Sequence, residues 1–249
     1  MVNLSKYIPE LLRLVRVVYP DWTDFSNPQF VADEIKYKRD ASDFAREQLD
    51  RDVLWSLIEQ GDTDGFIARL KAVAGKTNLL FMGVPSAGDL ALINQPDSDL
   101  DAICRMVFDL LHGDGDAAER LGTFCDLIAA NKLPQKWTFP TYYLFLLYPE
   151  NEVFVKPGRT QWLSRFTDGA IPYNAAPSGA GYAAIREGFH ALRDALQSQM
   201  TSPQSQSWLP DAQLQLNISS TSSDMIAIQS FVYVAHKAAG ESDVFEKAV

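Results

Sequence analysis

Apolar residues recur at helical spacing along most of this chain of 249 residues. The longest regular run is Tyr182, Ile185, Phe189, Leu192 and Leu196, at intervals of three and four residues. This spacing puts all five side chains on one side of a helix of about five turns. Shorter runs of the same kind occur at 8–18, 66–73, 100–110, 121–128 and 225–235. The sequence therefore predicts a mainly α protein, a bundle-like arrangement of several helices.

Helix boundaries are marked by residues that favour helix ends. Asp62, the acidic stretch 97–99 and Asp224 stand where N-caps are expected, and Gly61 and Gly75 stand where helices stop. The ranges 28–49 and 52–59 also have helical character, with Pro28 in a first turn. Extended structure is expected only in short pieces, at 79–82, 152–156 and 213–218.

The segments between these patterns are short and rich in Gly, Pro and Ser. They cover 83–99, 167–181 and 201–211. We expect an N-terminal helical part at 1–82 and a C-terminal helical part with short strands at 100–249, or one continuous domain over 1–249.

Composition indicates an ordinary soluble globular protein, with 47% apolar and 22% charged residues. The apolar face near the N-terminus is interrupted by four charged residues within 6–16, which argues against a signal peptide. No run approaches the roughly 18–20 apolar residues of a membrane span. The two cysteines are isolated, as is usual in a reducing compartment. We expect a cytoplasmic protein without membrane contact.

The net charge of −10 argues against general affinity for nucleic acid, which depends on Lys and Arg neutralising phosphates. The charge is unevenly distributed. Residues 78–135 hold 3 basic and 9 acidic side chains, whereas 136–170 hold 4 basic and 3 acidic ones. The slightly basic segment 136–170 also contains nine of the 28 aromatic side chains. Any contact with nucleic acid is therefore expected in this segment.

Within 136–170, six residues combine cationic groups with aromatic faces and form our candidate binding site. Aromatic rings can stack on bases while Lys and Arg contact phosphates. The alternative is that the aromatic rings belong to the core and the cations lie at its rim. The candidates are Tyr142, Tyr143, Lys156, Arg159, Trp162 and Arg165.

Other patterns with chemical character are weak. Gly75-Lys76-Thr77 ends like a phosphate-binding loop but lacks the earlier glycine of that motif. Asp21, Glu34 and Lys36 spell out a loose signature of metal-dependent nucleases, although the last two lie in a helical pattern. The Asp-rich stretches lack the Gly and Glu of calcium loops and are better explained as helix caps. We therefore predict no catalytic residue, metal site or cofactor.

Several ordered blocks in the second half carry a family likeness. They are the run Trp137 to Pro149, Val153-Phe154-Val155-Lys156-Pro157, Ile171-Pro172-Tyr173-Asn174 and the stretch from Asp224 to Val234. Together, over 136–236, they resemble a block found in bacterial proteins related to McrB-like AAA+ ATPases of restriction and defence systems. At Ala227 an acid is usual in that family. The resemblance implies an accessory or targeting module placed ahead of the ATPase or encoded beside it.

Three functions remain open from the sequence. The first is a non-catalytic recognition or regulatory module of a bacterial defence system, which binds a partner protein or nucleic acid through 136–170. The second is a small Mg²⁺-dependent nuclease that uses Asp21, Glu34 and Lys36. The third is an acidic helical scaffold for protein interaction, because an acidic surface suits basic partners.

Overall fold

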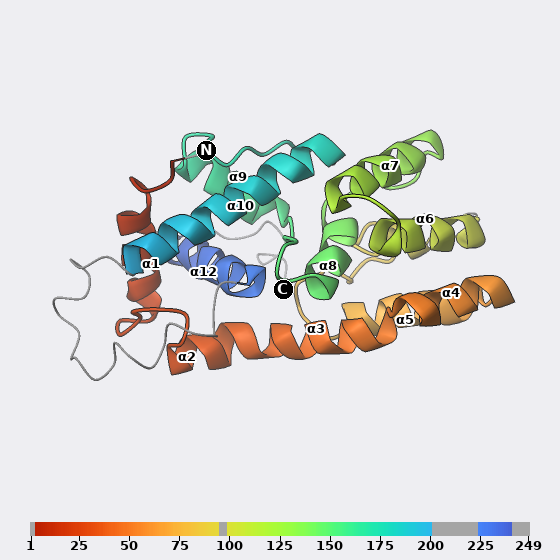
Figure 1. The fold of residues 1–249 in the computed structure, drawn as a ribbon, viewed down its shortest axis with the longest axis horizontal. Helices are drawn as coiled ribbons and strands as arrows, with labels where there is room; N and C mark the ends of the chain where they lie inside the picture. Colours follow the sequence, from red (N-terminus) through yellow and green to blue (C-terminus); the bar gives the residue numbers. More distant parts are fainter. Residues whose placement is uncertain (1–2, 95–98, 201–223, 241–249) are drawn as a thin grey trace. The chain divides into compact units, whose positions relative to one another are not determined.

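The chain folds into helices joined by irregular segments in a computed structural model that describes residues 3–94, 99–200 and 224–240 (Figure 1). The predicted mainly α fold is confirmed. Within the described ranges, no helix is both long and apolar enough to cross a membrane. The elements are α1 (Ile8–Val18), α2 (Pro28–Phe30), the π-helix η1 (Val31–Ile35), α3 (Lys36–Gln48), α4 (Arg51–Gln60), α5 (Thr63–Ala74), the 3₁₀ helix η2 (Ala91–Asn94), α6 (Leu100–His112), α7 (Ala117–Ala130), α8 (Thr138–Leu147), α9 (Pro157–Phe166), α10 (Gly179–Met200) and α12 (Met225–Ala238).

Two compact units share these elements, and each draws on separate stretches of the chain. The first unit contains the described residues of Met1–Tyr37, Gly158–Tyr173 and Ala184–Val249. The second contains those of Lys38–Pro157 and Asn174–Ala183. The described residues of the segment 83–99, which was expected as a boundary, belong to the second unit.

Aspartate side chains cap the N-termini of five of the described helices. Asp50, Asp62, Asp99, Asp116 and Asp224 each accept a hydrogen bond from a backbone N–H of the first helical turn. Such caps satisfy amides that have no partner within the helix and stabilise it by about 1 kcal/mol each. The interpretation of the Asp-rich stretches as helix caps is confirmed.

In the first unit, α1 packs against α12, and a cluster of aromatic rings lies beside them. The rings of Trp22 and Phe25 lie 5.3 Å and 6.0 Å from that of Phe231 on α12. The predicted helix over 28–49 is interrupted by the wide turn η1. Ser230 of α12 donates a hydrogen bond to the carbonyl oxygen of Glu34 in this turn, at 3.0 Å. This bond satisfies a carbonyl group at the point where the regular α-helical pattern is broken.

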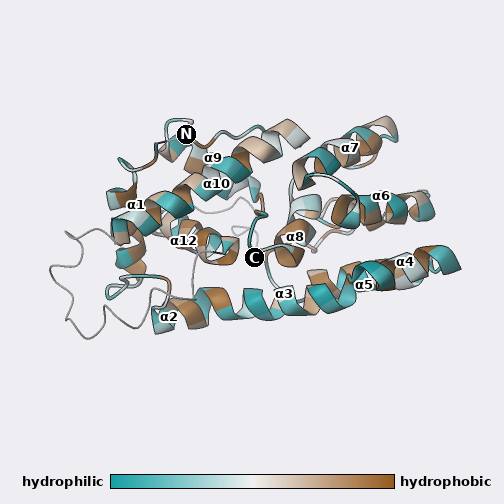
Figure 2. Ribbon diagram, viewed as in Figure 1, coloured by the Kyte–Doolittle hydropathy of each residue, from teal (hydrophilic) through white to brown (hydrophobic). Residues whose placement is uncertain are grey.

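In the second unit, α4, α5, α6 and α7 pack alongside one another, and α8 contacts α6 (Figure 1). All ten residues of α8 are buried, and the helix is largely apolar (Figure 2). A helix that is apolar on every side has no exposed face, so it forms the centre of a core. The part of the aromatic-rich segment 136–170 that forms α8 thus lies in the core of this unit.

The two expected strands that can be examined are irregular segments instead. In 152–156, the Val153 N–H donates to the Tyr182 hydroxyl oxygen at 3.1 Å, and the Val155 N–H donates to Thr141 Oγ1 at 3.0 Å. Side chains therefore take the place of a neighbouring strand. The segment 79–82 is likewise held by side chains, and 213–218 lies outside the described residues.

Replacing Tyr182 by Phe is expected to lower the free energy of unfolding by about 2 kcal/mol. Its hydroxyl donates to the buried Glu152 carboxylate at 2.8 Å and accepts the Val153 N–H, and both groups would lose this partner. Urea unfolding measures the change. Tyr173→Phe is the control, because this half-buried hydroxyl makes no hydrogen bond to a described residue. Equal stability of the two variants would contradict the role of the Tyr182 hydroxyl.

Candidate interaction site

Tyr142 and Tyr143, expected to offer stacking faces, are completely buried in α8. The Tyr142 hydroxyl donates to the Val73 carbonyl oxygen at 3.1 Å and lies 2.9 Å from Thr77 Oγ1. The Tyr143 hydroxyl donates to the Leu70 carbonyl oxygen at 3.0 Å. Burial raises the pKa of Tyr142 to about 12. These rings join α8 to the end of α5, so the core alternative describes them correctly.

The other members of the candidate set fall in different units. Lys156 belongs to the second unit, whereas Arg159, Trp162 and Arg165 belong to the first. Trp162 is 6% exposed, and its ring packs against Phe166. The Arg159 guanidinium lies 4.2 Å from the centre of the Tyr233 ring. Of the six candidates, only Arg165 is exposed, so the set offers no open aromatic faces for bases.

Lys156 forms a hydrogen bond and an ion pair within the second unit. Its Nζ donates to the Leu79 carbonyl oxygen at 2.8 Å and lies 3.8 Å from Asp89 Oδ2. The side chains of Lys156 and Asp89 are only 13% and 9% exposed. A buried cation beside a buried carboxylate depends strongly on that partner. Lys156 therefore has a positioning role in the second unit.

Asp89 and Lys156 hold the irregular segment 81–89, here called the 81–89 loop. Asp89 Oδ2 accepts the Phe81 N–H at 2.8 Å, and the Asp89 N–H donates to the Phe81 carbonyl oxygen at 2.7 Å. Thr138 of α8 donates to Asp89 Oδ1 at 2.7 Å. Lys136 Nζ donates to the carbonyl oxygens of residues 87 and 88. The loop is closed at its base and attached to the core.

The first half of the 81–89 loop exposes two apolar side chains. Met82 is 43% exposed and Val84 is 44% exposed. A Cβ on Gly88 would lie 2.7 Å from the carbonyl oxygens of Phe81 and Val84, so only glycine fits there without a shift. Such tight backbone packing holds the two apolar side chains outward on an ordered frame.

Trp55 is another exposed apolar side chain of the second unit, at 44% exposure. Its ring lies 5.2 Å from that of Phe108 on α6. The sequence carries a signal for this exposure: Leu54 and Ile58 form the buried stripe of α4, and Trp55 lies one residue away from it. The 81–89 loop carries no such signal, because its partners Lys136 and Lys156 lie far away in the sequence.

The residues of the nuclease alternative do not form a metal site among the described residues. Among the described residues, no group of three or more His, Cys, Asp or Glu side chains could hold a metal ion. Asp21 lies in the segment after α1, Glu34 lies in η1, and Lys36 begins α3 with an exposed side chain. The Tyr19 hydroxyl donates to Asp33 Oδ2 at 3.3 Å, so the acid next to Glu34 has a structural partner.

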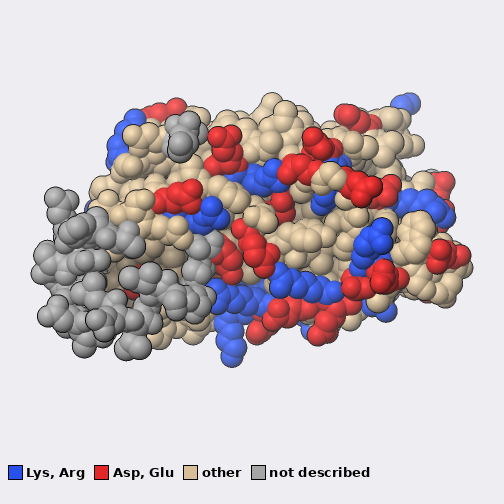
Figure 3. All heavy atoms as spheres, viewed as in Figure 1, with Lys and Arg blue, Asp and Glu red and all other residues tan. Residues whose placement is uncertain are grey.

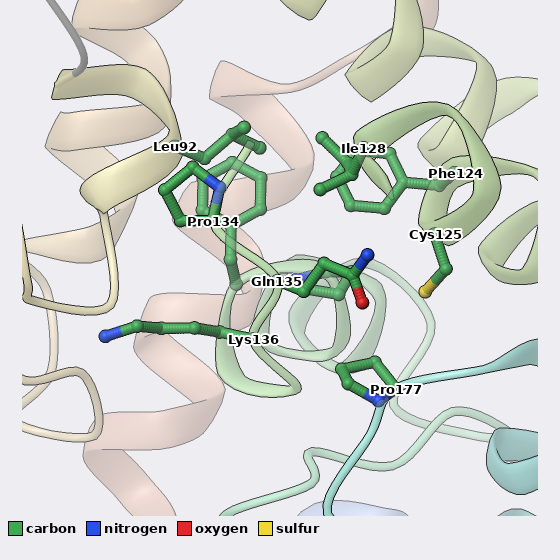
Figure 4. A pocket seen from close by; sticks show the side chains of 10 residues that line it. Leu92, Phe124, Cys125, Ile128, Pro134, Gln135, Lys136 and Pro177 are labelled. Atoms are coloured by element: carbon green, nitrogen blue, oxygen red, sulfur yellow. The ribbon is translucent and has the colours of Figure 1, made fainter. Parts of the chain in front are cut away.

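A shallow hollow of the second unit lies between α7, the start of α8 and Pro177 (Figure 4). Phe124, Cys125 and Ile128 line it with Lys136 nearby. It has room for about one water molecule, too little for a cofactor. Burial, and then Asp126, raises the pKa of Cys125 to about 11, so its thiol stays protonated near neutral pH. The hollow therefore offers neither the space for a cofactor nor a reactive thiol.

No family model, no curated protein and no solved structure matches this chain.

Replacing Asp89 by Ala is expected to lower the free energy of unfolding by about 3 kcal/mol, because Lys156, Thr138 and the Phe81 N–H lose a shared partner. Thermal and urea unfolding measure the loss. Asp126→Ala on the exposed face of α7 is the matched control and is expected to change stability by less than about 0.5 kcal/mol. A stable Asp89→Ala protein would show that the 81–89 loop is held by other contacts.

Both cysteines are expected to resist thiol reagents in the folded protein. Burial, and then Asp101, raises the pKa of Cys104 to about 12, and Cys125 is also shielded. With Ellman's reagent at mildly alkaline pH, we expect slow reaction of the native protein and rapid reaction of two thiols in urea. Rapid labelling of one thiol in the native protein would reveal an accessible, activated cysteine.

Proposed function

We propose that this chain is a non-catalytic recognition module that binds a partner protein. The observation that carries the proposal is the presence of exposed apolar side chains on ordered backbone in the second unit. Trp55 stands on a regular helix, and Met82 and Val84 stand on the 81–89 loop. Large exposed apolar side chains on a preordered frame lose little conformational freedom when a partner covers them.

A protein partner fits the charge better than nucleic acid does. The chain carries a net charge of −10. Over α4, α6 and α7, the face seen in Figure 3 has basic side chains interspersed with acidic ones. Lys136 and Lys156, two of the four cations of 136–170, donate to backbone carbonyl oxygens. Few cations in that segment are therefore available to contact phosphates.

The setting of the proposed module comes from the resemblance of 136–236 to proteins related to McrB-like AAA+ ATPases. We place the chain in a bacterial restriction or defence system on that basis. Its partner would be the AAA+ ATPase or another protein of the system. The chain would then supply recognition or regulation while the partner supplies the motor.

The proposal is tested with the purified full chain and an McrB-like AAA+ ATPase from the same genome. We expect a complex that elutes together in gel filtration. In parallel fluorescence polarisation at low salt, we expect no binding to single-stranded or double-stranded DNA or to RNA. Absence of a complex would contradict the assigned partner. Salt-sensitive nucleic-acid binding that is lost in Arg165→Glu would support the nucleic-acid alternative instead.

A further inference from the structure

The exposed ring of Trp55 lies on a surface built by α4 and α6, two helices that pack together in the second unit. Its inner edge is supported by Phe108, which is itself 5% exposed. The Arg51 guanidinium lies 5.9 Å from the centre of the Phe108 ring, one helical turn before Trp55. The Trp55 ring therefore has a packed base beneath it and an outer part open to solvent.

Charged side chains, most of them carboxylates, lie on the two helices that carry this ring and its support. On α4, Asp52 lies three residues before Trp55 and Glu59 lies four residues after it, so both are its neighbours on the helix surface. On α6, Arg105 lies one turn before Phe108 and pairs with Asp101 at 3.1 Å. Asp109 directly follows Phe108 on the same helix. We call Arg51, Asp52, Trp55, Glu59, Asp101, Arg105 and Asp109 the Trp55 surface; all seven are exposed.

Three of the four carboxylates of the Trp55 surface are not neutralised by an ion pair with a described residue of the chain. Arg105 is paired with Asp101. Within the described part of the chain, the side chains of Asp52, Glu59 and Asp109 form no ion pair. The surface thus combines one large aromatic ring with four carboxylates and two cations, of which Arg105 is paired with Asp101 and Arg51 lies against the Phe108 ring, so negative charge exceeds positive charge.

Building on the proposed function, we infer that the Trp55 surface binds a basic amphipathic helical segment of the partner protein. Apolar side chains of such a helix cover the Trp55 ring, and its Lys and Arg side chains meet Asp52, Glu59 and Asp109. A cation can also lie over the indole face, where the ring attracts positive charge. Tryptophan is among the residues that dominate binding at protein interfaces.

Charge complementarity selects this occupant over others. A nucleic acid would bring phosphates next to three open carboxylates. A second copy of this chain, docked symmetrically, would place the same acidic surfaces against each other, and like charges in contact oppose binding. A basic helix is the occupant that satisfies both the ring and the carboxylates.

The test uses the full chain and two fluorescent peptides. One is a designed amphipathic helix with a Leu stripe and Lys and Arg on its flanks, and the other has Glu at every Lys and Arg position. We expect the basic peptide to bind with an affinity that falls as salt rises. Trp55→Ala and the double variant Asp52→Lys, Glu59→Lys are each expected to weaken binding at least tenfold. Circular dichroism and thermal unfolding check that each variant is folded.

Matched controls come from α7 of the same unit. Leu127 is 40% exposed and Asp126 is exposed, so Leu127→Ala and Asp126→Lys repeat the loss of an apolar group and the charge reversal elsewhere. We expect both controls to bind the basic peptide as the native chain does. Equal loss in the controls, or equal binding of the acidic peptide, would overturn the inference. Self-association that is lost in Trp55→Ala, measured by sedimentation, would assign the surface to a second copy instead.

The same variants separate this inference from the proposed function. If the AAA+ ATPase binds the native chain and Trp55→Ala equally, the chain is a recognition module but the Trp55 surface is not its contact. If the basic peptide binds at Trp55 while the ATPase does not bind at all, the surface stands and the assigned partner is wrong.

Discussion

Every polar group on the buried helix α8 has to find its partner inside the protein, and the second unit is organised around these partners. Tyr142 and Tyr143 donate to backbone carbonyl oxygens at the end of α5. Thr141 donates to the Trp137 carbonyl oxygen and accepts the Val155 N–H. Because an unmet buried hydrogen bond costs about 1–3 kcal/mol, these contacts constrain where α5 and 152–156 can lie. The burial of α8 therefore positions a neighbouring helix and also a segment that has no regular structure of its own.

The same constraint reaches the surface through Thr138. Its hydroxyl donates to Asp89, whose other oxygen accepts the Phe81 N–H at the base of the 81–89 loop. Lys156 follows α8 in the chain and returns to the Leu79 carbonyl oxygen and to Asp89. The exposed 81–89 loop, which carries Met82 and Val84, is thus connected to α8 at the centre of the core through hydrogen bonds of Asp89. A loop attached in this way presents its exposed apolar side chains with little loss of entropy on binding.

The helices could be predicted from sequence because their signals are local. Apolar spacing places Tyr182, Ile185 and Phe189 on one buried face, and Asp224 caps the helix that follows it in the chain. The buried helix α8 gives no such period, since all its faces are apolar, and its tyrosines near basic residues have the same composition as a ligand-binding surface. Only burial in three dimensions distinguishes the two interpretations.

Long-range partners explain the remaining differences. Alternation at 152–156 is typical of a strand, but the N–H groups of Val153 and Val155 meet Tyr182 and Thr141, which no local pattern reveals. The internal role of Lys156 is hidden for the same reason. From the sequence alone its charge is that of a phosphate-binding residue, and only the fold brings Asp89 next to it. Position along a helix does reveal Trp55, since the residue falls beside the buried stripe of α4 instead of within it.

Acidic charge and an exposed aromatic ring have complementary effects on partner choice. The ring alone would attract any apolar surface, and the carboxylates alone would attract any cation. Together on the Trp55 surface they disfavour acidic proteins and nucleic acid, because binding there would bury unpaired carboxylates against like charge. The chain's net charge of −10 extends this discrimination beyond the contact itself, since it repels polyanions before they reach the surface. A strongly acidic helical protein can therefore expose a large aromatic side chain and still restrict what binds to it.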